Sequence, residues 1–576
     1  MASKLSGLSF IGFQRGSVGG RIMHAMNPTT RTPLPEAFHS ALPAEVKTAA
    51  NLAEDAAPVF RATPRATRAA FLRSIAAGLA AATPQLSARA ALESALNDAR
   101  CVSEIGRTMN QLRLFADVCE KGEWSSPRIE TAQPDRLPVP RPDHRSMGIG
   151  IGPVGVFCAS NFPVAYSVAG GDTASAFAAG CPVIVMAHHA HPGTAELVAD
   201  IIVTAARSHC LPEGTFSLLM GDGVDVGQQL AKQPALRAIG FTGSRVGGRA
   251  LMDTCAGRPV PIPVYAEMSS VNPVVLLEGA LRERADAIAA GLVSSCTQGL
   301  GQFCTQPGLH ILVRSPTAEA FVDKVCHASN SLMLPKACCR ISFVAHAFQV
   351  SALFRAAPDG VMLTAGIHNS YVRSTEARNS RADVKLLATG ISSGHAGSAV
   401  PALYSVSAKT FQGDASLHEE VFGPCSLVIW CDSIDEMKAL LAGLDGNLTA
   451  TLHASAEELS SVAPSLIPLL QSNAGRVIIN GFPTGVEAVS HAIVRRTRTL
   501  AMQPIVSLTL LQVHGGPYPA LSDGRTTSVG SNAIHRFSRL VCFQNFPDAL
   551  LPDELKNSNP LRIMRTVNGE NTDSAV

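Results

Sequence analysis

Strand-like and helix-like segments alternate between residues 149 and 248, and this alternation restricts the fold more than any other feature of the chain. Short runs of branched apolar residues are typical of strands, and helical spacing or a helix-start proline follows them. The expected strands are 149–159, 181–187, 216–220 and 235–241, and the expected helices are 167–179 and a segment opened by Pro192. This order predicts an α/β fold, with a parallel sheet that helices cover on both faces.

Length and charge narrow the classes of protein to consider. The chain has 576 residues, too many for one ordinary core, so we expect two or more domains. A formal net charge of +2 gives no electrostatic reason to expect nucleic acid or an anionic membrane as a partner. No apolar run reaches the roughly 18 residues of a transmembrane helix, so no membrane span is expected.

The 14 cysteines are irregularly spaced and form no C-x-x-C motif, which favours a reducing, intracellular compartment. The first 20 residues lack the long apolar core of a secretory signal. We therefore expect a cytoplasmic protein. A mitochondrial location stays open, because Arg15 and Arg21 precede the first acidic residue, Glu36.

A glycine-rich turn closes one expected strand and opens a helix. Gly243 and Gly248 frame a G-x-x-x-x-G pattern that includes Ser244. Backbone N–H groups at the start of a helix can hold a pyrophosphate, helped by the helix dipole. The pattern is neither G-x-G-x-x-G nor a P-loop, and a plain turn is the alternative. Its place in the alternating pattern favours a cofactor phosphate.

Three side chains supply the parts of one reaction. Cys304 offers a thiol nucleophile, Glu267 a carboxylate base and Asn161 an amide donor. Each also has an ordinary interpretation, because most free cysteines are inert, strand-end carboxylates are usually solvated, and Asn-Phe-Pro can be only a turn. Together they are the groups needed to oxidise an aldehyde through a thioester. Cys296 is the alternative nucleophile, without a supporting motif.

The sequences around these side chains resemble the aldehyde dehydrogenase superfamily, in the stretches 159–163, 265–269 and 301–305. Longer matches extend the resemblance over nearly the whole chain. They point to the branch of semialdehyde and fatty aldehyde dehydrogenases, and they occupy residues 160–180, 188–193, 482–487, 514–519 and 525–530.

The resemblance implies roles for individual residues. Cys304 is expected to be the nucleophile, Glu267 the base that activates water, and Asn161 an oxyanion donor. Glu420 is expected to hold the nicotinamide ribose, with Phe422 packed near the ring. The expected cofactor is NADP or NAD, with NADP favoured by the branch. The expected substrate is a carboxylate-bearing semialdehyde oxidised to 2-oxoglutarate, and a medium- or long-chain aliphatic aldehyde is the alternative.

The resemblance also implies the domain organisation: a doubly wound NAD(P)-binding domain, an α/β catalytic domain and a small oligomerisation element, in a homodimer or homotetramer. The expected divisions are 1–126 for the N-terminal part of the cofactor-binding domain, 127–147 for an oligomerisation ribbon, 148–270 for the Rossmann-like domain, 271–490 for the catalytic domain, and 491–576 for the C-terminal region and oligomerisation tail.

One departure from the family concerns the cofactor. Met186 stands where the family usually has a lysine that donates to adenosine-ribose oxygens, and methionine cannot donate. Losing one charge-assisted hydrogen bond costs roughly 1.5–3 kcal/mol, or about 10- to 150-fold in affinity. Arg245 is a candidate for partial replacement.

Two other departures are insertions, at about residues 331–354 and 494–512. They are either surface loops or translated non-coding sequence, and we expect the second to be foreign to the fold. Ile505 to Leu511 is apolar and β-prone, which makes an exposed loop prone to aggregation. With Met186, these insertions leave open an inactive homologue as an alternative function.

Two other chemistries have weaker sequence support. Residues 390–394 fit the G-x-S-x-G pattern of serine hydrolases, with Ser392 at the nucleophile position. No helix signal follows, and His395 is adjacent instead of distant in sequence. A metal site is not expected, because the histidines at 188, 189 and 191 have no second cluster with ligand spacing.

Overall fold

The computed structural model describes residues 5–326, 354–484 and 513–576. The expected insertions at 331–354 and 494–512 lie outside the described residues, except for Phe354.

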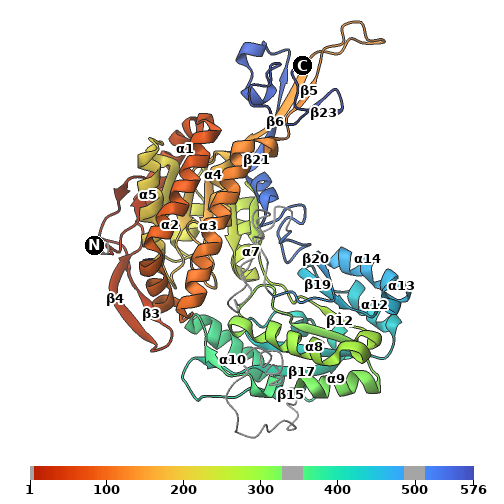
Figure 1. Cartoon of the computed structure of the whole chain (residues 1–576). Helices are drawn as coiled ribbons and strands as arrows, with labels where there is room; N and C mark the ends of the chain where they lie inside the picture. Colours follow the sequence, from red (N-terminus) through yellow and green to blue (C-terminus); the bar gives the residue numbers. More distant parts are fainter. Residues whose placement is uncertain (1–4, 327–353, 485–512) are drawn as a thin grey trace, which may run out of the picture.

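The first sheet has the strand order β11-β10-β7-β8-β9-β1-β2 (Figure 1). Strands β7 to β11 are parallel, and β1 pairs antiparallel with β9. The four expected strand segments each contain or overlap one of β7 to β10, so the predicted parallel sheet is confirmed. The strands are β1 (Phe10–Ile11), β2 (Gln14–Arg15), β7 (Val154–Phe157), β8 (Val183–Met186), β9 (Phe216–Leu219), β10 (Ala238–Thr242) and β11 (Val264–Glu267).

Helices cover both faces of this sheet because alternate strand residues point to opposite sides. In β8, Val183 and Val185 pack in one core with α2 to α5, whereas Ile184 and Met186 pack in another with α1, α6 and α7. This double winding was predicted. The helices are α1 (Pro43–Ala62), α2 (Arg65–Ser94), α3 (Asp98–Lys121), α4 (Gly171–Ala179), α5 (Pro192–Ser208), α6 (Val226–Ala231) and α7 (Arg245–Ala256).

A second sheet has the order β15-β17-β18-β13-β12-β19-β20 and is parallel except for β15. Helices α8 and α9 pack on one face, and α10, α11, α12 and α14 pack on the other. The strands are β12 (Val274–Leu276), β13 (Leu309–Val313), β15 (Lys385–Thr389), β17 (Ala402–Ser407), β18 (Cys425–Cys431), β19 (Asn447–His453) and β20 (Ala474–Ile479). The helices are α8 (Glu278–Thr297), α9 (Pro316–Cys326), α10 (Ala365–Asn379), α11 (Ala408–Gln412), α12 (Ile434–Ala442), α13 (Ala456–Ser461) and α14 (Ala463–Asn473).

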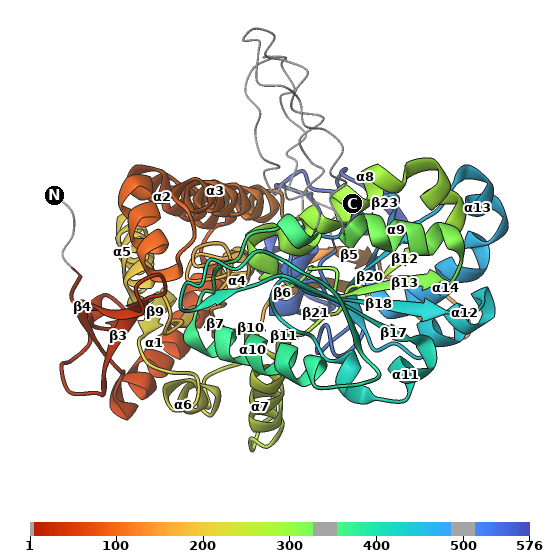
Figure 2. The ribbon, with the colours of Figure 1, turned by 90° about the horizontal axis from the view of Figure 1, so that it is seen from below.

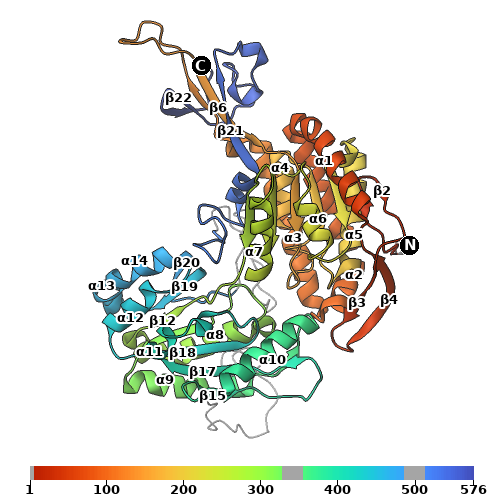
Figure 3. The same cartoon turned by 180° about the vertical axis from the view of Figure 1, so that it is seen from behind.

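A third, smaller sheet projects from the rest of the molecule, as Figures 1 and 3 show from opposite sides. It joins the expected 127–147 ribbon to the C-terminal region. Its order is β21-β6-β5-β22-β23, from β5 (Arg128–Glu130), β6 (His144–Gly150), β21 (Ser538–Gln544), β22 (Arg565–Val567) and β23 (Glu570–Thr572). Two further pairs are β3 (Ile22–Asn27) with β4 (Thr32–His39), and β14 (Gly360–Val361) with β16 (Ser398–Ala399).

Within the described residues, none of the helices combines the length and apolarity that crossing a bilayer requires.

Candidate active site

The two large sheets lie in separate halves of the molecule, as Figure 2 shows from below. The candidate thiol lies where residues from both halves meet. Glu267 is the last residue of β11 in the first sheet and is 2% exposed. Cys304 lies in the loop that leads from α8 to β13 of the second sheet. His514 lies in the segment before β21, a strand of the third sheet, and it is 1% exposed. Three distant parts of the chain therefore meet at this point.

The side chains of Cys304, His514 and Glu267 are in direct contact. His514 Nε2 lies 3.4 Å from Cys304 Sγ and 2.9 Å from Glu267 Oε1. Ser528 Oγ donates to the other carboxylate oxygen at 3.1 Å and also to the His514 backbone carbonyl at 3.0 Å. The carboxylate expected to act as a base is thus next to the thiol and is held in place by its neighbours.

Burial and neighbouring groups shift the pKa values of Glu267 and Cys304. Burial alone would raise the pKa of Glu267, but His514, Cys304 and Ser528 together hold that pKa below its usual value. Burial raises the pKa of Cys304 well above its usual value, and the negative charge of Glu267 raises it further. The resting pair is therefore a neutral thiol beside an ionised carboxylate, which can accept the thiol proton when substrate binds.

The nucleophile loop is held by contacts on both sides. Asn272 Nδ2 donates to the carbonyls of Cys304, at 2.8 Å, and Gln306, at 2.9 Å. Gly301 has a φ of +62°, and a Cβ there would lie 2.4 Å from the backbone of Gly423. Only glycine fits so close a backbone approach, which explains the residue three positions before the thiol.

Asn161 lies beside the same loop. Its Nδ2 donates to the carbonyl of Gln302 at 3.1 Å, so its amide faces the loop that leads to the thiol. A cavity of about 370 Å³ is lined by Asn161 together with Arg100, Phe303 and Leu363, and its described lining does not include Cys304. The cavity therefore adjoins the proposed oxyanion donor but not the thiol itself.

Cys296, the alternative nucleophile, is enclosed. It is 0% exposed in the core under α8, and burial raises its pKa to about 12. Its nearest polar neighbours are Ser426, whose Oγ donates to its Sγ at 3.3 Å, and His310, at 3.6 Å. Glu267 is not among these neighbours. The geometry therefore favours Cys304.

The glycine-rich turn lies where the sequence places it, between β10 and α7. Ser244 is the N-cap of α7, with its side chain accepting from Gly247 N at 3.2 Å, and the first turn of the helix is exposed. Gly243 is exposed, whereas Gly248 is buried. A Cβ on Gly248 would lie 2.6 Å from Met268 Sδ, so this glycine permits close packing of α7 on the sheet. The exposed helix start fits an anionic cofactor group.

The other expected cofactor residues lie in two places. Glu420 and Phe422 are half-buried in the segment before β18. Burial raises the pKa of Glu420 to about 8, against hydrogen bonds from Ser269 and the Ser270 backbone that lower it. A carboxyl that is partly protonated near neutral pH can both accept from and donate to ribose hydroxyls. Met186 ends β8, is 3% exposed, and packs in the apolar core with α6.

Other candidates from the sequence find less support. Ser392 is exposed, its Oγ accepts from Gly394 N, and no helix follows it within residues 390–397, so the arrangement is not that of a hydrolase nucleophile. The ligand atoms of Glu267, Cys304 and His514 lie within 4.8 Å of one another, the spacing of a possible metal site. The Glu267 carboxylate already accepts hydrogen bonds from His514 and Ser528. The predicted absence of a metal stays a prediction.

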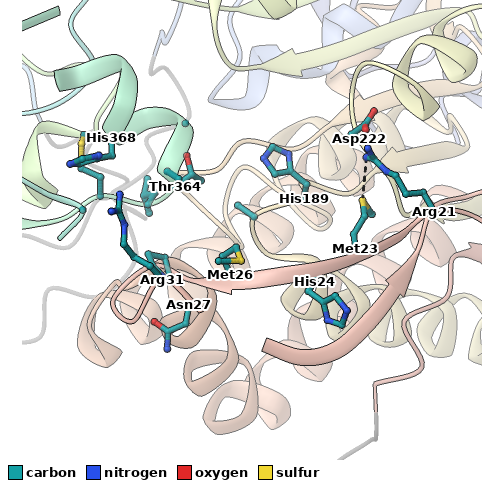
Figure 4. A pocket seen from close by; sticks show the side chains of 17 residues that line it. Arg21, Met23, His24, Met26, Asn27, Arg31, His189, Asp222, Thr364 and His368 are labelled. Carbon is teal, nitrogen blue, oxygen red and sulfur yellow. Dashed lines mark hydrogen bonds and ion pairs between the residues drawn. The ribbon is translucent and has the colours of Figure 1, made fainter. Parts of the chain in front are cut away.

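A further cavity of about 490 Å³ lies between the β3–β4 hairpin, the turns after β8 and β9, and the start of α10 (Figure 4). Arg21 and Asp222 pair on its wall, and His189 and His368 face it from opposite sides. Its described lining does not include Cys304. It therefore adjoins the carboxyl end of the first sheet but is separate from the thiol.

Comparison with known proteins agrees with this geometry. Residues 15–492 match the aldehyde dehydrogenase family, which is most of the chain. The protein belongs to the aldehyde dehydrogenase family. It is an oxidoreductase that acts on aldehydes with a nicotinamide cofactor.

Two curated relatives match nearly the whole chain. The chain is 44% identical over 568 residues to alpha-ketoglutaric semialdehyde dehydrogenase 2 of Azospirillum brasilense, covering 98% of this chain and 99% of the relative. It is 41% identical over 571 residues to alpha-ketoglutaric semialdehyde dehydrogenase of Acinetobacter baylyi, with the same coverage. The predicted family and branch are confirmed.

Solved structures agree in fold. A 1-pyrroline-5-carboxylate dehydrogenase superposes with a TM-score of 0.72 at 19% identity, covering 93% of this chain and 92% of that one. A structure of such an enzyme from Thermus, with bound NAD, gives 0.71 at 19% identity and the same coverage. At this identity the likeness concerns the fold alone, and it confirms the predicted fold class.

Three residues of this site have no role predicted from the sequence: His514, Ser528 and Asn272. The first two lie in stretches that resemble the family branch, and that resemblance was the available signal. Asn272 has a φ of +45° beside Pro273, a conformation in which asparagine is enriched. Nothing in its sequence context indicates the contact with Cys304.

Proposed function

We propose that the protein oxidises 2,5-dioxopentanoate, a semialdehyde with a carboxylate, to 2-oxoglutarate. The contact of Cys304 with His514 and Glu267 supports thioester chemistry at this thiol. The substrate follows from the two relatives that match the whole chain and are named for this semialdehyde.

The residues of this chain have separate parts in the reaction. Glu267, alone or through His514, takes the thiol proton, and the Cys304 sulfur attacks the aldehyde carbon to give a thiohemiacetal. Asn161 and the Cys304 backbone N–H are the donors to its oxyanion. A bound nicotinamide would accept the hydride that the thiohemiacetal loses when it becomes a thioester. Once Glu267 has released the thiol proton to solvent, it removes a proton from the water that attacks the thioester. The carboxylate product then leaves, and the released sulfur regains a proton.

We propose that the coenzyme lies along the carboxyl ends of the parallel strands, the usual position in open α/β sheets. The exposed first turn of α7, with Gly243 and Ser244, is the candidate diphosphate site. Glu420 is the candidate ribose ligand. NADP is favoured over NAD by the family branch, although Met186 removes the usual lysine.

The small third sheet is the proposed contact between subunits of a homodimer or homotetramer. Its strands and the loop between β5 and β6 expose apolar side chains, with Leu137 89% and Leu540 72% exposed. Exposed apolar groups on a projecting sheet favour pairing with a second copy.

Purified full-length protein tests the substrate assignment. NAD(P)H formation at 340 nm should be faster, at low substrate concentration, with 2,5-dioxopentanoate than with pentanal or decanal. Mass spectrometry should identify 2-oxoglutarate as the product. A preference for decanal would replace the proposal with the aliphatic aldehyde alternative, and no turnover with any aldehyde would favour an inactive homologue.

A further inference from the structure

Arg107 is a buried cation with hydrogen-bond donors that have no partner. It lies on α3 and is 4% exposed. Nη2 donates to the Tyr166 hydroxyl at 3.0 Å, whereas Nε and Nη1 are buried without a hydrogen-bond partner in the described part of the chain. No carboxylate pairs with it among those residues. Such a group is costly to bury unless something else satisfies it.

The aromatic contacts of Arg107 place it beside the loop that carries the thiol. The Phe162 ring, 5.8 Å from the Arg107 guanidinium, packs on the Phe303 ring with the two ring centres 5.6 Å apart. Phe303 directly precedes Cys304 in the chain. Burial raises the pKa of Cys304, and the charge of Arg107 opposes that shift. The unpaired donors of Arg107 therefore lie near the thiol loop.

Arg476 approaches the same place from the second sheet. It lies on β20, its Nη2 donates to the Pro483 carbonyl at 2.7 Å, and its Nε is buried without a partner among the described residues. Burial lowers its pKa, while Cys304 and Tyr166 act in the opposite direction. Thr484, which follows Pro483, donates to the Thr305 carbonyl at 3.3 Å, so the segment that Arg476 contacts lies beside the thiol loop. One guanidinium group from helix α3 and one from strand β20 thus lie near this loop.

Aromatic contacts explain only part of this arrangement. The Arg107 guanidinium lies 4.8 Å from the Tyr166 ring centre and 5.8 Å from that of Phe162. Cation–π contacts of this kind stabilise the charge but leave the in-plane N–H groups unsatisfied. A planar guanidinium with free N–H groups matches the geometry of a carboxylate.

We propose that Arg107, assisted by Arg476, binds the carboxylate of the substrate while the aldehyde end lies at Cys304. The substrate class is then short-chain aldehydes with a carboxylate at the opposite end. Tyr166 is a positioning residue that fixes Arg107. This inference rests on the proposed function, because it requires an aldehyde at Cys304.

Selectivity between an acidic and a neutral aldehyde tests the assignment. We would measure kcat/KM for 2,5-dioxopentanoate, succinate semialdehyde and pentanal in the full-length protein and in Arg107→Met. Losing charge-assisted hydrogen bonds should lower the ratio of kcat/KM for either acid to that for pentanal by about 100-fold. Arg476→Met should lower it by about 10-fold. Arg113→Met, at an exposed position of the same helix, is the matched control and should leave the ratio unchanged.

Arg107→Lys separates carboxylate binding from a purely structural role. Because lysine keeps the charge but loses the fork, it should restore the ratio to within about 10-fold of the unmodified protein. Equal losses for acidic and neutral aldehydes in both variants would overturn the inference, since they would indicate damage to the site in general.

A binding measurement keeps this inference distinct from the proposed function. Calorimetric titration with 2-oxoglutarate needs no turnover. The dissociation constant should be at least 10-fold higher for Arg107→Met than for Arg113→Met. If no aldehyde is oxidised but this difference remains, the proposed activity fails and the carboxylate site stands. If aldehydes are oxidised without any such difference, the site assignment fails and the activity stands.

Discussion

The thiol site and the coenzyme edge of this protein differ in how completely their polar groups are paired. At the thiol, the Glu267 carboxylate has hydrogen bonds from His514, Ser528 and Cys304. At the coenzyme edge, the residue that ends β8 is Met186, a side chain that donates nothing, and the first turn of α7 is exposed. Under the proposed function, the polar groups for the chemical step are paired in advance, and coenzyme affinity is where we expect this chain to depart from its family.

The largest expected effect tests the thiol side of that comparison. Cys304→Ser should lower turnover by a factor of about 1000 or more, because a hydroxyl is far harder to deprotonate than a thiol. Coenzyme binding, measured by fluorescence titration, should be little changed. Cys296→Ala is the matched control and should keep most of the activity. Retained activity in Cys304→Ser together with its loss in Cys296→Ala would transfer the role to Cys296.

Glu267→Gln should change both the kinetics and the thiol. Without the base the thioester is not hydrolysed, so steady turnover should fall by about 100-fold or more. Burial raises the pKa of Cys304 and the charge of Glu267 raises it further, so removing that charge should lower it. The pH midpoint of iodoacetamide alkylation should therefore move to lower pH, and a first burst of NAD(P)H should remain because the thiol ionises more readily. Loss of the burst would show that removal of the thiol proton cannot proceed without Glu267.

His514→Leu should have a smaller effect of about 10-fold on kcat/KM, since one hydrogen bond to a charged group is lost. Burial raises the pKa of Glu267, and His514 contributes most among the groups that lower it. Without the imidazole that pKa should rise, so the acid limb of the pH–rate profile should move to higher pH. His514→Gln keeps a donor and should shift the limb less. Equal shifts in both variants would argue against this role.

The smallest expected effect addresses the coenzyme edge. Met186→Lys should tighten NADP binding by about 10-fold, because a lysine stem can occupy the methionine space while its ammonium reaches the edge of the sheet. Calorimetry measures the change. Met186→Leu conserves the apolar volume and should leave the affinity unchanged. Weaker binding in the lysine variant would show that the buried position, 3% exposed, does not admit a charge.

Local patterns predicted the first sheet because its evidence is contained in short segments. The strand candidates from 149 to 241 each contain or overlap a real strand, and the helix opened by Pro192 begins at that residue. The expected helix at 167 begins instead at Gly171, because residues before it form turns, with Gly170 N bonded to the Ser167 carbonyl. Helix boundaries depend on such capping contacts more than on periodicity.

Local sequence patterns could not predict which residues distant in the chain contact each other. Glu267 and Cys304 were recognised from their motifs, but the contact between Glu267 and His514 spans 247 positions. The sequence around Arg107 also does not indicate that this side chain is buried with unpaired donors. A side chain's unsatisfied donors become visible only when every neighbouring element is in place.

By itself, the sequence determined the strand and helix order of the first sheet and the family, and it predicted the thiol chemistry, because residue type and short spacing are sufficient for those. Tertiary structure alone decided which groups share a site. It brought Cys304, Glu267 and His514 together, enclosed Cys296, and left Arg107 with unpaired donors near the thiol. The physical reason is that hydrogen bonding and charge act over a few ångströms in space, whatever the separation along the chain.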